Sequence, residues 1–317
     1  MPAVLRRSTA IPLRTDTASA IHRLSPGRSF SCRFVGYDTQ AAIVWMVIGS
    51  EAIADGTLTR GQLRWNYDAV LPDVYLAKGE PRGVIANANA AFLWTRRSGI
   101  VAGRAAAALH GVNGIGEFTP IELIATHRRP QPGVIIRDER IEPDEIKTIG
   151  WMPVTTPART ALDLARHLPR DSAVVVLDRL AAVTGVGLDL VGPLEERYRG
   201  ARGMARAWTA LALMDGGTRS PEETKLRLRL HDAGLPRPQT GILLEDGNAS
   251  AELGMGWPDV KVGVSYCQGI DVMAVQTIQR QELIQRLGWF EILVVDGRPV
   301  RSVVYRVRQA LRQRGGL

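Results

Sequence analysis

The sequence predicts an α/β (α+β) protein built from several domains. Its 317 residues are 45% hydrophobic, which is enough apolar content to bury real cores and more chain than one typical domain uses. Along most of the chain, segments that alternate like strands lie between segments with the capped pattern of helices. The C-terminal third has the clearest start and stop signals, and it predicts one sheet flanked by helices.

Charge and cysteine content narrow the classes of function. Lys and Arg total 40 against 32 Asp and Glu, a formal net charge of +8, which favours phosphate-rich partners such as nucleic acids. Cys32 and Cys267 are the two cysteines, so neither a disulfide framework nor a cysteine metal cluster is expected, and a reducing cytoplasm fits best. No apolar run approaches the ~20 residues of a membrane span, so we expect no membrane partner.

Residues 1–45 have neither helical nor strand periodicity, and arginines are scattered among their Ser, Thr and Ala residues. We expect a basic, disordered tail that lies outside the fold, with Met46 as a candidate natural start. A basic arm that binds nucleic acid is the alternative for the same residues.

Residues 46–82 have the element order of a winged helix. The pattern predicts a short helix stopped by Gly56, a second helix capped by Thr59, and a hairpin around Pro72 and Asp73. Helix, turn, helix and two strands therefore define a winged-helix-like N-terminal domain.

In a winged helix, the second helix offers its side chains to DNA. Here that helix carries Arg60, Gln62 and Arg64, which we take as candidate nucleic-acid contacts. The alternative is that the helical pair and hairpin pack on a neighbouring domain and do not touch DNA.

Residues 83–215 are expected to form a mixed α/β middle domain. Two strand-like segments precede a helix that has Pro157 in its first turn, where the missing proline N–H is favourable. Arg159 and Asp163 lie four residues apart on that helix and can pair. His110, at the end of another helix, is expected to be a cap or a hydrogen bonder of the core and not a catalytic residue.

Residues 216–317 predict the order helix, three strands, helix, strand, helix. Ser220 is the expected cap of the first helix, Pro221 its first residue and Gly234 its terminator. The second and third strands form a hairpin across the turn at Trp257.

Several sequence words in this region occur together, in order, in a known family: SPEETKLR, GWPDVKV, RQELIQRLGW and the closing RVRQAL. Over about residues 216–315 the chain resembles the DUF559 proteins, relatives of the very-short-patch repair endonuclease in the PD-(D/E)XK nuclease superfamily. The resemblance implies a restriction-endonuclease-like fold. Upstream, GTLTRGQLR, GRAAAALHG and VTTPARTALDLAR resemble the AbiEi-type antitoxin architecture, a winged helix followed by an α/β domain.

The resemblance also implies where the carboxylates of a nuclease would stand. A helix glutamate remains as Glu223, whereas four positions that hold acidic residues in the family are Gly254, Ser265, Cys267 and Thr277 here. Hydrolysis of a phosphodiester with Mg²⁺ needs hard oxygen ligands, typically carboxylates, and these four residues supply none. We therefore expect a degenerate site with no metal and no cofactor.

A relocated metal site is the alternative. Glu252 is two residues from Gly254 and so on the same face of the expected strand, and Asp271 lies in the loop after the next strand. Together with Glu223 they would hold Mg²⁺, which this alternative requires.

The expected function is nucleic-acid binding without cleavage, in an antitoxin-like or transcription-regulating protein. DNA is the expected partner and a cognate toxin protein a second candidate. Lys261 and Arg280 in the C-terminal domain are further candidate nucleic-acid contacts. The alternatives are an active Mg²⁺-dependent DNA endonuclease in repair and a decayed paralogue with no biochemical task.

Overall fold

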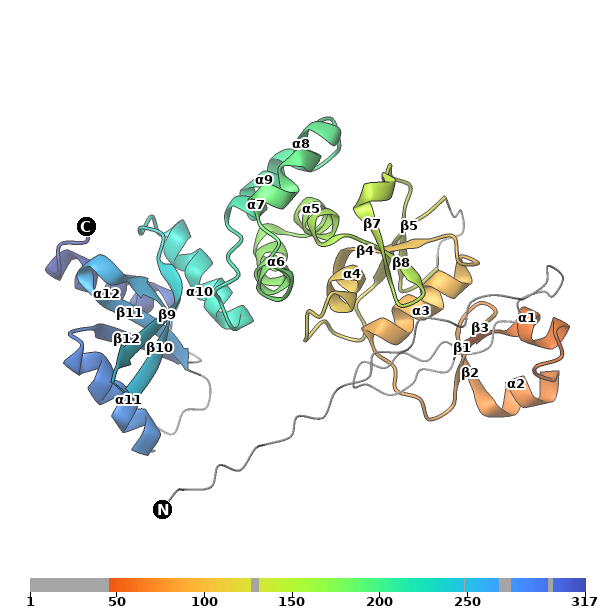
Figure 1. Cartoon of the computed structure of the whole chain (residues 1–317), viewed down its shortest axis with the longest axis horizontal. Coiled ribbons are helices and arrows are strands. Elements are labelled where there is room, and N and C mark those ends of the chain that lie inside the picture. The colour runs from red at the N-terminus through yellow and green to blue at the C-terminus, as the bar shows by residue number, and fades with distance from the viewer. Residues whose placement is uncertain (1–45, 127–130, 248, 268–274, 296–298) are drawn as a thin grey trace, which may run out of the picture. The chain divides into compact units, whose positions relative to one another are not determined.

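The computed structural model describes residues 46–126, 131–247, 249–267, 275–295 and 299–317 (Figure 1). The expected tail and Asp271 lie outside the described residues. Three sheets with helices packed on them confirm the α/β (α+β) class. No helix in the described ranges combines the length and the apolarity that a bilayer crossing requires.

The first described segment is a small antiparallel sheet with two short helices. Its elements are β1 (Met46–Ile48), α1 (Gly49–Ala54), α2 (Arg60–Asn66), β2 (Tyr67–Leu71) and β3 (Val74–Ala77), with the sheet order β1-β3-β2. The helix pair and the hairpin confirm the expected pattern, and β1 is a strand that the pattern did not predict. Buried Val47, Ala52 and Leu63 form the core between the helices and the sheet.

Helix α3 (Val84–Trp94) is buried along most of its length. Ala90 and Leu93 pack with the first sheet, while Ala88 and Phe92 pack with the second. A helix that is apolar on nearly all sides needs such cover from more than one direction.

The middle region is a five-stranded mixed sheet followed by a helical layer. The strands β4 (Ile100–Ala102), β5 (Ile121–Ile124), β6 (Val134–Arg137), β7 (Ile146–Ile149) and β8 (Met152–Thr155) have the order β6-β5-β4-β8-β7. Helix α4 (Gly103–Leu109) follows β4, and a 3-10 turn, η1 (Pro143–Glu145), precedes β7. The later helices are α5 (Pro157–His167), α6 (Arg170–Thr184), α7 (Leu188–Val191), α8 (Pro193–Arg197) and α9 (Met204–Ala212). They share one apolar cluster that includes Leu164, Leu177 and Leu211.

The C-terminal region has the order that the sequence predicts, α-β-β-β-α-β-α. Its elements are α10 (Pro221–Asp232), β9 (Gln239–Asp246), β10 (Ala249–Trp257), β11 (Val262–Cys267), α11 (Val275–Arg286), β12 (Phe290–Val295) and α12 (Val300–Gln313). The sheet order is β12-β11-β10-β9, with β11 and β12 parallel and the other pairs antiparallel. The expected cap is confirmed, because Ser220 Oγ accepts a hydrogen bond from Glu223 N at 3.1 Å.

Two apolar clusters sandwich this sheet. Leu226 of α10 and Val307 of α12 belong to one cluster, and Leu283 of α11 belongs to the other. Figure 1 shows α11 and α12 on opposite sides of the strands. The C-terminal sheet is therefore flanked by helices, as expected.

Candidate functional site

Helix α2 presents two arginines to solvent. Arg60 and Arg64 are both exposed, and neither forms an ion pair with a residue in the described ranges. Because they lie four residues apart, they share one face of the helix. Trp65 beside them is 74% exposed, which is unusual for a large aromatic side chain.

Gln62 has a different place from its two neighbours. Its Oε1 accepts a hydrogen bond from Thr59 N at 2.8 Å, while Thr59 Oγ1 accepts one from Gln62 N. This reciprocal capping box fixes the start of α2. The side-chain oxygen of Gln62 therefore stabilises the helix that carries Arg60 and Arg64.

Lys261 and Arg280 lie in the C-terminal region, residues 216–317. Lys261 is exposed and donates from Nζ to Leu287 O at 3.0 Å. Arg280 of α11 turns into the fold, where its guanidinium meets Glu291 of β12 with 2.6 Å between Nη2 and Oε1. Arg280 is thus part of an ion pair with a buried glutamate, and its side chain is 29% exposed; a contact with nucleic acid stays a prediction.

Glu223 lies directly against Gly254. The Glu223 side chain is buried, and its Oε2 accepts a hydrogen bond from Arg219 N at 2.9 Å. A Cβ added at Gly254 would stand 2.8 Å from Glu223 Oε1, which is too close for an unstrained contact. Glu223 therefore lies against the position that the resemblance aligns with an aspartate, and there is room for this glutamate because residue 254 is glycine.

Strand β10 changes face at Gly254. Leu253 packs in the α11 cluster, but Met255, two residues on, packs in the α10 and α12 cluster. In a regular strand, residues two apart share a face. Glu252 and Gly254 do share a face, as expected, because the Glu252 carboxylate meets Arg219 and a Cβ at Gly254 would meet Glu223, which Arg219 N holds. The alternation breaks after Gly254. Gly254 N lies 3.4 Å from Ser265 Oγ.

Ser265 takes part in a network built on Arg280. Its hydroxyl donates to Glu291 Oε1 at 2.6 Å, and Arg280 Nη2 lies 3.3 Å from the same hydroxyl. Arg280 also donates to Glu252 O at 2.8 Å and to Glu291 Oε2 at 2.9 Å. A fixed guanidinium thus stands beside the strand positions where a nuclease would hold its metal.

The other carboxylate of the relocated-metal alternative is also paired. Glu252 Oε2 lies 2.7 Å from Arg219 Nη1, and Arg219 N holds Glu223. One arginine residue therefore contacts both glutamates. Asp271, the third expected ligand, lies outside the described residues.

Cys267 and Thr277 are the other two positions that the resemblance aligns with acidic residues. Cys267 is buried. Burial and the nearby Glu291 raise the pKa of its thiol, against a lowering effect of Arg280, so it stays a neutral thiol and a poor ligand for Mg²⁺. Thr277 is half-buried on α11. Neither residue restores a carboxylate.

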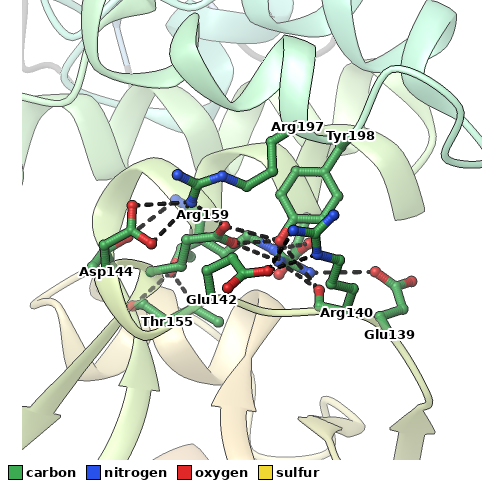
Figure 2. Close-up of polar contacts among 12 residues, drawn as sticks. Glu139, Arg140, Glu142, Asp144, Thr155, Arg159, Arg197 and Tyr198 are labelled. Atoms are coloured by element: carbon green, nitrogen blue, oxygen red, sulfur yellow. Dashed lines mark hydrogen bonds and ion pairs between the residues drawn. The ribbon is translucent and has the colours of Figure 1, made fainter.

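A second polar site, which the sequence showed only in part, lies in the middle region (Figure 2). The expected pair is confirmed, with Arg159 Nε 2.9 Å from Asp163 Oδ1. Arg159 is fully buried, and its Nη1 also meets Glu145 Oε2 at 2.6 Å and Tyr198 Oη at 2.7 Å. Arg197 approaches Glu145 as well, at 2.6 Å. The dashed lines in Figure 2 converge on this group from several segments of the chain.

Next to this network, Glu139, Asp163 and His167 face one another. Each offers one ligand atom, and the three atoms lie within 4.8 Å of one another. Partial burial would raise the pKa of Glu139, but contacts with His167 and Arg166 outweigh it and lower the pKa to about 2. Burial raises the pKa of Asp163 to about 6, against the opposing charge of Arg159.

Some of these residues could have been found from the sequence. Glu291 is a charged residue in an otherwise apolar strand, FEILVV, and a charge in such a place usually has a buried partner. His167 follows Asp163 by four residues and so shares its helix face. Glu139 and Glu145 had no such signal, because both come from the irregular segment before β7.

His110 fits its expected structural role. Its Nε2 lies 2.8 Å from Thr155 O, and burial lowers its pKa. It is therefore a hydrogen-bonding residue at the end of α4.

Comparison with known proteins gives distant relatives. Two proteins of Mycobacterium tuberculosis, from strains CDC 1551 and H37Rv and both described as uncharacterized, are each 27% identical to this chain over 175 residues. The match covers 53% of this chain and 64% of each relative, so this chain spans less than two thirds of their length. No family model matches the chain.

Proposed function

We propose that this chain is a DNA-binding protein that does not cleave DNA, with helix α2 as a contact surface. The observation that carries the proposal is the exposed pair Arg60 and Arg64, which have no ion-pair partner in the described ranges and lie on one helix face. Free guanidinium groups on the second helix of a winged-helix-like segment are suited to phosphates and base edges.

The C-terminal domain supports the second half of the proposal. Glu223, Glu252 and Glu291 are each held by an arginine residue, through Arg219 or Arg280. A divalent cation would have to compete with these bonds and with the charge of the Arg280 guanidinium. We therefore propose an endonuclease-like domain that has lost its metal and serves in binding.

The biological setting belongs to the same proposal. An antitoxin-like or transcription-regulating protein of the cytoplasm, with a cognate toxin as a second partner, is consistent with the excess of basic residues. The competing function is an active Mg²⁺-dependent endonuclease with ligands at Glu223, Glu252 and Asp271.

The test of DNA binding is a titration of duplex DNA at several salt concentrations. Changing Arg60 and Arg64 to alanine should weaken binding, and it should lower the slope of log K against log salt by about one for each phosphate that the variant no longer neutralises. The matched control changes Arg199 and Arg229, two exposed arginines elsewhere, and removes the same net charge. Equal effects of the two double variants, or no effect of either, would remove α2 from the interface.

A further inference from the structure

The cluster formed by Glu139, Asp163 and His167 has the composition of a metal site. Asp163 and His167 lie four residues apart on α5, and Glu139 comes from the segment between β6 and η1. Two ligands at this spacing on one helix face are an arrangement that helices use to bind Zn²⁺. A third ligand from a separate segment would then tie that segment to the helix.

Two side-chain atoms of the cluster have unused hydrogen-bonding capacity, which indicates a bound ligand. Asp163 is 1% exposed, yet its Oδ2 has no hydrogen-bond partner in the described part of the chain. His167 Nε2 likewise lacks a well-aligned partner, although it stands 3.2 Å from Glu139 Oε1. Buried polar atoms are normally satisfied, so an orphaned buried carboxylate oxygen needs an explanation.

The separation of the atoms suits a small cation. Metal–ligand bonds of about 2.0–2.2 Å in a tetrahedral zinc site put neighbouring ligand atoms about 3.3–3.6 Å apart. The Nε2–Oε1 distance of 3.2 Å is close to that edge. The ligand atom of Asp163 lies within 4.8 Å of the other two, so a small side-chain adjustment completes the triangle.

The neighbouring arginines orient the carboxylates and leave the ligand atoms free. Arg159 Nε holds Asp163 Oδ1 at 2.9 Å, and Arg166 Nη1 holds Glu139 Oε2 at 2.8 Å. The other oxygen of Glu139, Oε1, is the one that stands 3.2 Å from His167 Nε2, and the other oxygen of Asp163, Oδ2, has no hydrogen-bond partner in the described part of the chain. Ligating carboxylates are commonly fixed by such outer hydrogen bonds.

The net charge of the surrounding network and the exposure of the cluster to solvent also permit a cation to bind. Within the described network the carboxylates of Glu139, Asp144, Glu145 and Asp163 outnumber the guanidinium groups of Arg159, Arg166 and Arg197 by one. The side chains of Glu139 and His167 are 22% and 15% exposed, which leaves an entry path from solvent.

We propose that Glu139, Asp163 and His167 bind a zinc ion, with a water molecule as the fourth ligand. One imidazole and two carboxylates suit Zn²⁺ better than Mg²⁺, which prefers an all-oxygen octahedral set. The ion fixes the segment before β7 to helix α5. The site is separate from the degenerate nuclease positions and independent of DNA binding.

The test uses the full chain, stripped with a chelator and titrated with Zn²⁺ alone in a calorimeter. We expect one equivalent to bind to the wild type and to His231→Gln, an exposed histidine on α10. His167→Gln and Glu139→Gln should each weaken binding by at least about tenfold. Far-ultraviolet circular dichroism of the metal-free proteins checks that the variants are folded.

Two further readouts keep the proposal open to refutation if a variant fails to fold. Zn²⁺ should raise the melting temperature of the wild type and of His231→Gln, because a ligand that binds the native state stabilises it. Co²⁺ in the wild type should give the strong visible absorption of a four-coordinate ion. Absence of stoichiometric binding, equal binding by folded His167→Gln, or the weak spectrum of six-coordinate Co²⁺ would overturn the assignment.

Discussion

Replacing Arg280 by methionine should destabilise the fold around the C-terminal sheet. The guanidinium is 29% exposed, while the Glu291 side chain that it pairs with is 4% exposed. Methionine keeps much of the apolar stem but removes the charge, so Glu291 is left buried with Ser265 as its remaining described hydrogen-bond partner. Breaking a buried pair in this way costs about 3–5 kcal/mol. The partial exposure of Arg280 places the expected destabilisation near the lower end, at about 3 kcal/mol.

Urea denaturation, with fluorescence as the signal, measures this destabilisation. At about 2–4 °C per kcal/mol, a thermal scan should show a fall of about 6–12 °C. Arg229→Met, at an exposed arginine on α10, is the control and should change stability by less than about 0.5 kcal/mol.

A double-mutant cycle isolates the pair itself. Glu291→Leu combined with Arg280→Met should cost less than the sum of the two single changes, with a coupling energy of about 1–3 kcal/mol. If Arg280→Met costs no more than Arg229→Met, or if the two changes are additive, the guanidinium does not hold this site together.

Three further outcomes are expected. Asp178→Ala should cost about 3–5 kcal/mol in urea denaturation, because it strands Arg227 in a buried pair whose atoms are 2.7 Å apart; a cost below about 1 kcal/mol would contradict this. The lowered pKa of Glu139, about 2 against 4.5, contributes stability above about pH 4.5 that disappears as the pH falls towards 2. With chelator present, the free energies of unfolding of the wild type and Glu139→Gln, measured as a function of pH, should therefore converge as the pH falls over that range. A constant difference between the two proteins would refute the pairing of Glu139 with His167 and Arg166. Gly254→Ala should lower the free energy of unfolding by about 1–3 kcal/mol, because the new Cβ meets Glu223 at 2.8 Å. Combining it with Glu223→Ala should remove this loss. An unchanged free energy of unfolding in Gly254→Ala would contradict the close contact.

The elements with local signals were predictable from the sequence. Ser220 and Pro221 mark the start of α10, and the alternating runs after them became the strands of one sheet in the expected order. Thr59 capped α2 as expected. Caps and periodicity are written in adjacent residues, so they can be recognised without knowledge of the fold.

The features that depend on distant partners were not predictable. Strand β1 has three residues and exists because Met46 and Ile48 pair with β3, some way along the chain. The spacing of Arg159 and Asp163 predicted their pair, but its burial involves Tyr198, which follows α8 in the chain. Likewise, nothing local in the sequence indicates that Glu291 lies beside Arg280.

The change of face at Gly254 shows the same limit within one strand. Regular alternation correctly placed Glu252 and Gly254 on one face, but it would also have placed Leu253 and Met255 together, and these two belong to different clusters. Tertiary packing of α10 and α11 on the two faces decides where each side chain points.

DNA binding without cleavage is tested most directly by one titration of supercoiled and linear duplex DNA, with Mg²⁺ or Mn²⁺ and with chelator, in which each sample is run on native and denaturing gels. We predict a mobility shift in every condition and no metal-dependent nick, because the carboxylates near Gly254 are held by Arg219 and Arg280. Metal-dependent nicking that is abolished by Glu223→Ala or Glu252→Ala would contradict the proposed absence of cleavage and establish a working nuclease site. Absence of any shift at low salt would contradict the proposed DNA binding itself.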